Sequence, residues 1–337
     1  MSKHYFSAAN TPYGFYSCFE NVLPYDKANK IIYIKGGSGS GKSTLMKRLA
    51  GEAEKRGITT EWFHCSSDPD SLDGVSFLEP GTAIFDATAP HVMDPKYPGI
   101  VDEIFNIGDF WKKELLTPHR KEMERLTEIK KGCFEDAYQY FLAAKALFHT
   151  NGSTDPGKVQ KAADKITASF GPIAPKTGRT RKLFASGLTP KGNVNYLDSI
   201  LQGKVTGITG GQEASMLIKE INRRANLAGY DTDVFYCPFS PEDKMEHLVI
   251  PALNCSFTTV NPYHNYDGIG DMIVLSMEGR DDSNLIRTLI DSGIKSLAKA
   301  KQWHSEIEAI YIPAMDFPKL EEKFGYLSQQ LFPDAAE

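Results

Sequence analysis

The sequence predicts an α/β fold of two consecutive domains, each built on a parallel sheet. At 337 residues the chain exceeds what one hydrophobic core usually holds. Residues 30–57 read as a buried strand, a glycine-rich loop and an amphipathic helix. Residues 39–90 also match residues 211–262 without a gap, with twelve identities where about three are expected by chance. We therefore expect one domain at 1–178 and a second at 179–337.

The composition is that of a globular protein. Hydrophobic residues make up 41% and charged residues 24%, and the net charge of -5 argues against nucleic-acid binding. Because no apolar stretch is long enough for a membrane span and the N-terminus "MSKHYFSAANTPYG" lacks a signal-peptide core, we expect a cytoplasmic protein without membrane partners. The five cysteines are odd in number and lack CxxC spacing, so reduced thiols are expected.

The first glycine-rich loop follows an apolar run. In "KIIYIKGGSGSGKST", residues 31–34 predict a strand buried on both faces, and the pattern G-x-x-x-x-G-K-[ST] follows directly. Glycines let backbone N–H groups approach a phosphate at the N-terminus of the next helix, which Gly57 ends. Lys42 would contact the β and γ phosphates, and Ser43 would bind Mg²⁺. The expected cofactor-binding residues are Gly36, Gly37, Ser38, Gly39, Ser40, Gly41, Lys42, Ser43 and Thr44.

A second candidate is Asp86, which ends the apolar run of "GTAIFDATAPH". It follows the strand after the loop-helix unit, where an aspartate can hold Mg²⁺. We therefore expect Lys42 and Asp86 to be catalytic, and Ser43 and Asp86 to form the metal site.

These residues resemble the Walker A and Walker B motifs of the P-loop NTPase superfamily. The chain as a whole is similar to a little-characterised family of bacterial tandem P-loop ATP-binding proteins, through "HYFSAANTPYGFYS", "HCSSDPDSLDG", "DATAPHVMDPKYPG" and "RKLFASGLTPKG". The resemblance implies two Rossmann-like P-loop domains, with ATP and Mg²⁺ as cofactors. ATPases of the additional-strand class place a glutamate after the aspartate, whereas Ala87 stands here; "FDATAPH" is also similar to the D-G-x-P-R of nucleoside monophosphate kinases.

The internal repeat predicts that the second loop is degenerate. "GITGGQEAS" aligns with the first loop, but Glu213 replaces Gly41 and Ala214 replaces Lys42. The ungapped alignment also replaces Asp86 with Thr258. A carboxylate at the phosphate position would repel a nucleotide, so we expect no Mg-nucleotide in copy two.

Downstream of each core the pattern becomes helical, which predicts a helical hairpin in each domain. In copy one, apolar residues recur at helical spacing from Phe134 to Phe148, and Asp155 with Pro156 predicts the start of another helix. In copy two the same spacing runs from Leu285 to Ile310.

Three further segments carry chemistry-bearing residues. "HCSSDPDSLDG" predicts a polar loop that binds a substrate, a γ-phosphate or a metal, or forms only Asx turns; zinc is disfavoured because Tyr236 replaces His64 in the repeat. His91 and His264 are structural or catalytic histidines one position apart in the alignment. The segment "PKTGRTRK" is either a solvated linker or contributes an arginine finger through Arg179 or Arg181. Arg223 and Arg224, on the helix of copy two, are the competing candidates for that role.

Three functions are compatible with these residues. The leading hypothesis is a Mg²⁺-dependent ATPase, a hydrolase with one active site in the first domain. The second is a phosphotransferase acting on a nucleotide, small molecule or protein acceptor. The third is an ATP-gated switch or scaffold without appreciable turnover, suggested by the absence of a glutamate after Asp86.

Overall fold

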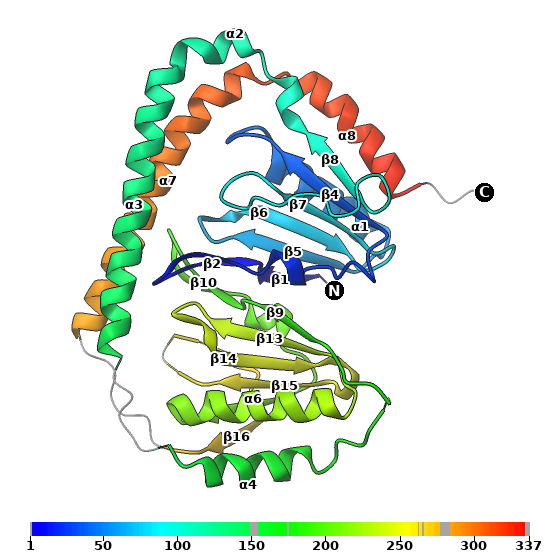
Figure 1. Ribbon diagram of the computed structural model, residues 1–337, viewed down its shortest axis with the longest axis vertical. Helices are drawn as coiled ribbons and strands as arrows, with labels where there is room; N and C mark the ends of the chain where they lie inside the picture. The colour runs from blue at the N-terminus through cyan, green and yellow to red at the C-terminus, as the bar shows by residue number, and fades with distance from the viewer. Residues whose placement is uncertain are drawn as a thin grey trace. The chain divides into compact units, whose positions relative to one another are not determined.

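The computed structural model describes residues 2–148, 154–173, 175–261, 263–264, 266–276 and 284–333 (Figure 1). The expected α/β class is confirmed, since the chain contains two six-stranded sheets covered by helices. It forms two compact units. The first comprises Met1–Lys3, Val22–Asp136 and Lys295–Glu337, and the second comprises His4–Asn21 and Ala137–Ile294.

The first sheet is mixed, not parallel as predicted. Its order is β1-β5-β6-β7-β4-β8, with β4 parallel to β7 and β8, and β6 antiparallel to β5 and β7. The chain returns from β5 into β6 through a tight connection, and such a connection produces an antiparallel pair. The strands are β1 (Lys3–Phe6), β4 (Lys30–Lys35), β5 (Thr60–Cys65), β6 (Asp68–Phe77), β7 (Thr82–Asp86) and β8 (Asp102–Asn106).

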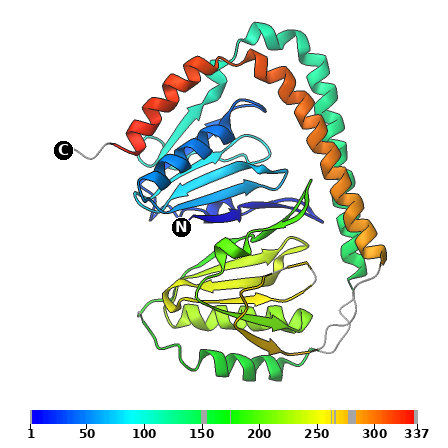
Figure 2. The same ribbon diagram turned by 180° about the vertical axis from the view of Figure 1, so that it is seen from behind.

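Two helices complete the core of the first unit. In α1 (Lys42–Lys55), Leu45, Met46 and Leu49 are buried against the sheet. The last helix, α8 (Phe317–Leu331), buries four apolar residues in the same core, and Figure 2 shows it beside α1. The short elements of this unit are η2 (Ile107–Phe110), α2 (Lys113–Leu116), η3 (Thr117–His119) and η5 (Ile312–Ala314).

The second unit contains a sheet with the same strand order, β9-β13-β14-β15-β12-β16. Here β14 is antiparallel to its neighbours and the remaining pairs are parallel. The strands are β9 (Thr180–Leu183), β12 (Lys204–Thr209), β13 (Thr232–Cys237), β14 (Ser240–Ile250), β15 (Cys255–Thr259) and β16 (Asp271–Val274). The repeat of the sequence is therefore also a repeat of the topology.

Two β-hairpins in the second unit correspond to the matching segments "YFSAANTPYG" and "LFASGLTPKG". They are formed by β2 with β3 and by β10 with β11. In each turn a threonine hydroxyl donates to a glycine carbonyl, from Thr11 to Gly14 at 2.7 Å and from Thr189 to Gly192 at 2.8 Å. The remaining elements here are β2 (Ala8–Thr11), β3 (Gly14–Ser17), η1 (Phe19–Asn21), β10 (Ser186–Thr189), β11 (Gly192–Asn195), α5 (Leu197–Ile200) and η4 (Pro251–Leu253).

The compact units do not follow the predicted boundary between residues 178 and 179. Helix α4 (Pro156–Thr167) packs on α6 (Gly211–Leu227) in the second unit, where Val159 and Ala163 join the core (Figure 1). Helix α8 belongs to the first unit. The core against which its apolar face packs determines the unit to which each helix belongs, and its position in the sequence does not. Asp155 caps α4 as predicted, accepting from the N–H groups of residues 157 and 158.

The predicted helical hairpin in each domain is also corrected, because each repeat supplies one long helix. These are α3 (Arg120–Leu147) and α7 (Asn284–Tyr311), and the division between the units falls within both. In the second unit, Ala144 of α3 packs with Ile286 and Ile290 of α7. No helix in the described part of the chain has the length and apolar character needed to cross a membrane.

Replacing Phe324 of α8 with alanine should destabilise the first unit. Phe324 is 4% exposed and packs with residues of α1, so the free energy of unfolding should fall by about 3–5 kcal/mol in urea unfolding. Tyr326→Ala is the matched control on the same helix. Because Tyr326 is 53% exposed, its loss should change stability by less than about 0.5 kcal/mol. Equal effects of the two substitutions would contradict this assignment of α8.

Candidate functional site

The first glycine-rich loop joins β4 to α1 at the carboxyl end of the parallel strands. Residues 36–41 form the loop, and Lys42 is the first residue of α1. Gly39 and Gly41 have φ angles of 66° and 91°, in the left-handed region that favours glycine. Gly41 precedes the helix without a side-chain cap. The loop thus presents its backbone at a helix N-terminus.

The backbone N–H groups of this loop are unpaired. Within the described chain, none of the N–H groups of residues 37–43 donates a hydrogen bond. The first N–H group inside the helix that does so is that of Leu45, which donates to Gly41 at 2.9 Å. A row of free N–H groups at a helix N-terminus favours an anion electrostatically.

The side chains of Lys42 and Asp86 meet beside the loop. The Lys42 ammonium is 3.5 Å from the Asp86 carboxylate, and both side chains are mostly buried. Lys42 also donates to the carbonyls of Gly36 and Gly37, at 2.7 Å each. The other oxygen of Asp86 accepts from the N–H of Thr88 at 2.9 Å.

The remaining predicted side chains differ in their contacts and exposure. The Ser43 hydroxyl accepts from the N–H of Leu72 at 3.0 Å, which places it next to β6. The Ser40 hydroxyl donates to Gly37 at 2.8 Å and stabilises the loop from within. Ser38 is half-buried and Thr44 is exposed.

Thr88 is a site residue that the sequence analysis did not identify. Its hydroxyl donates to the Gly36 carbonyl at 2.8 Å, while the Gly36 N–H is 3.1 Å from the same oxygen. Thr88 therefore holds the first residue of the loop from both sides. Its position two residues after Asp86 is the only sequence signal that could have identified it.

Trp111 and Tyr311 pack against the loop and were also missed. Their ring centroids are 5.2 Å apart. A methyl group added at Gly37 would lie 3.0 Å from the Trp111 ring, so glycine is required there for close approach. The Trp111 indole N–H is buried without a hydrogen-bond partner in the described structure. The two residues lie far apart in the sequence, so no sequence motif indicated that they would meet at the loop.

The segment "HCSSDPDSLDG" is not the predicted loop. Most of it forms the hairpin of β5 and β6, and His64 contacts the carbonyl of Pro69. Cys65, Asp73 and His91 instead come together, with donor atoms within 4.8 Å of one another. His91 is 3.5 Å from Asp73. Burial raises the pKa of Asp73, and burial together with Asp73 raises the pKa of the Cys65 thiol well above its usual range.

Strand register corrects the alignment of the two copies by one residue. Phe63 pairs with Gly74, whereas the equivalent Phe235 pairs with His247, because β14 contains one residue more than β6. Following this register along β15, the counterpart of Asp86 is Thr259 and not Thr258. Neither threonine supplies a carboxylate.

The connection between strand and helix is shorter in copy two than in copy one. Only Gly210 separates β12 from α6, which starts at Gly211. The Glu213 carboxylate is buried at the start of α6 and accepts from the N–H of Asp155 at 2.7 Å. An acidic side chain thus lies at the N-terminus of this helix, where the first copy has free N–H groups.

Three of the four arginine-finger candidates form ion pairs within the second unit. Arg181 binds Asp233 at 2.8 Å, while Arg223 and Arg224 both bind Glu220 at 2.7 Å. The backbone N–H of Arg179 donates to Asp231. These contacts give the side chains of Arg181, Arg223 and Arg224 structural partners within the second unit.

Comparison of the chain with known proteins identified no relative. No family model matches the chain, and neither the curated proteins nor the solved structures compared with it include a significant match.

Replacing Thr88 with valine should loosen the loop. Valine keeps the shape but removes the hydroxyl that bonds both polar groups of Gly36, so we expect a loss of about 1–3 kcal/mol in stability. Hydrogen exchange of the Gly36 N–H, which loses its acceptor, should accelerate. Thr88→Ser retains the hydroxyl and should behave like the unaltered protein; equal acceleration in both variants would contradict the role assigned to Thr88.

Proposed function

We propose that the first unit binds Mg-ATP and hydrolyses it as a P-loop NTPase of the tandem ATP-binding family that the sequence resembles. The observation that carries this proposal is the row of free N–H groups at residues 37–43, at the start of α1. A triphosphate offers the negative charge and the acceptor oxygens that these groups lack. The buried N–H of Trp111 is a further donor beside the loop.

Lys42 would change partners when nucleotide binds. Its ammonium now bonds the loop's own carbonyls, and a phosphate oxygen would replace them. Ser43 and Asp86 fit a magnesium ion, since hydroxyl and carboxylate oxygens are the ligands that it prefers. With the ion bound, its charge and that of Lys42 would stabilise the transferring phosphoryl group.

A phosphotransferase is the second candidate function. The strand that ends in Asp86 pairs directly with the P-loop strand, so no strand lies between them as in ATPases of the additional-strand class. The residue after Asp86 is Ala87, which has no group that could polarise water. Both observations favour an acceptor other than water.

Replacing Lys42 with alanine should weaken Mg-ATP binding. Removing the ammonium leaves the phosphates without their cationic partner, so affinity measured by calorimetry should fall at least tenfold. Lys55→Ala is the control, because Lys55 is exposed at the far end of the same helix. A change in Trp111 fluorescence on nucleotide addition gives a second measure of binding. The change should disappear in Trp111→Phe, which assigns it to this residue. Unchanged affinity in Lys42→Ala would exclude this loop as the nucleotide site.

Phosphate release separates the two reactions. A hydrolase should release phosphate from Mg-ATP alone, and Asp86→Asn should slow this because the metal loses a charged ligand. A phosphotransferase should consume ATP appreciably only when nucleoside monophosphates or other acceptors are added. Binding without turnover under either condition would favour a switch and count against both enzymes, whereas stronger binding of GTP would contradict the assignment of ATP.

A further inference from the structure

A second cluster of metal-ligand side chains lies inside the second unit, far in sequence from the P-loop. Glu246, His247 and His264 are each less than 10% exposed, and their donor atoms lie within 4.8 Å of one another. The His264 ring nitrogen Nε2 is 3.2 Å from Glu246 Oε2, and the two histidine rings are 4.8 Å apart. Two imidazoles and one carboxylate form the ligand set of many zinc enzymes.

A β-bulge brings the cluster together. In β14, His247 pairs with Phe235 and Met245 pairs with Tyr236, so Glu246 has no partner residue on β13. Adjacent residues of a regular strand point to opposite faces, but a bulge re-aims one of them. Glu246 and His247 can therefore contribute to one site although they are neighbours in sequence.

Two donor atoms of the cluster lack a hydrogen-bond partner within the described chain: His247 Nε2 and Glu246 Oε2. The opposite atom of each side chain is held in place. His247 Nδ1 is 2.7 Å from the Thr258 hydroxyl, and Glu246 Oε1 is 3.0 Å from Lys244. Outer contacts of this kind orient metal ligands.

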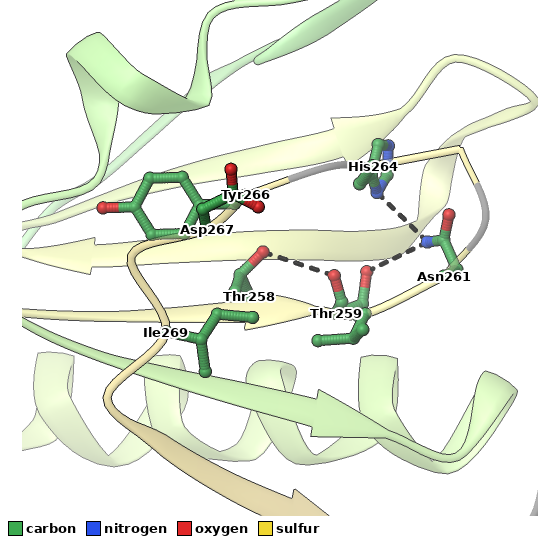
Figure 3. A pocket seen from close by; sticks show the side chains of 8 residues that line it. Thr258, Thr259, Asn261, His264, Tyr266, Asp267 and Ile269 are labelled. Atoms are coloured by element: carbon green, nitrogen blue, oxygen red, sulfur yellow. Dashed lines mark hydrogen bonds between the residues drawn. The ribbon is translucent and has the colours of Figure 1, made fainter.

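The cluster adjoins a cavity of about 210 Å³ at the end of β15. Figure 3 shows His264 and Asn261 on its wall, with Thr258 and Thr259 from the strand itself. His264 thus belongs to both the cluster and the cavity, and Thr258, which holds His247, lines the cavity as well. Asp267 and Tyr266 add polar groups to the same wall.

The first unit repeats this arrangement. Asp73 occupies the equivalent bulge of β6, and the corrected register makes His91 the counterpart of His264. The third side chain comes from a different strand in each copy, Cys65 at the end of β5 in the first unit and His247 of β14 in the second. Both copies have kept an acidic residue and a histidine in contact, although only one has kept its P-loop.

We propose that Glu246, His247 and His264 bind one zinc-type divalent ion whose open coordination position faces the cavity at the end of β15. Three protein ligands and one open position define a catalytic type of zinc site. The open position takes water or a small polar ligand that fits the cavity.

Cobalt substitution tests the site directly. Untagged protein, stripped with a chelator, is titrated with Co²⁺ in the Cys65→Ala background, which removes the sulfur ligand of the other cluster. We expect the visible absorption of a four-coordinate Co²⁺ ion, which Zn²⁺ then displaces. His247→Ala and His264→Ala should each weaken binding at least tenfold, and His119→Ala, an exposed histidine of the first unit, should leave it unchanged.

A second variant keeps the test decisive if a histidine variant does not fold. Thr258→Val retains all three ligands but removes the contact to His247 Nδ1, so metal affinity should fall about 10–100-fold. No metal binding by the Cys65→Ala protein, or equal binding by the His247→Ala, Thr258→Val and His119→Ala proteins, would overturn the proposal. Neither result depends on nucleotide binding, so the test is independent of the function proposed for the first unit.

Discussion

The packing of one helix against the sheet of its unit is the contact on which the rest of each unit depends. In the first unit, Leu45, Met46 and Leu49 of α1 are buried against the sheet, which places the start of the helix at the carboxyl end of β4. The loop can leave its N–H groups unpaired because this packing stabilises the helix independently of them. In the second unit α6 packs in the same way.

Much of the candidate nucleotide site could be predicted from the sequence because it is local. The loop and the start of α1 follow from glycine, lysine and apolar spacing within residues 30–57, and the cap at Asp155 follows from two adjacent residues. Asp86 also lies beside Lys42, as its position after an apolar strand implied. In each case the controlling interaction joins residues close in sequence or on neighbouring strands.

The features that the sequence did not reveal depend on contacts between distant residues. Trp111 and Tyr311 meet beside the loop although 200 residues separate them. The apolar faces of α4 and α8 suit any apolar surface, so their pattern could not identify which core they cover. The extra residue in β14 shifted an ungapped alignment by one, which hid the correspondence of His91 with His264.

The placement of α8 has a consequence for the synthesis of the chain. The core of the first unit contains Leu320, Phe324 and Leu327, which lie after every strand of both sheets in the sequence. While the ribosome is still making the second sheet, the apolar side of α1 therefore lacks part of its cover. The first unit therefore completes its core last, although its glycine-rich loop is among the first parts of the chain to be made.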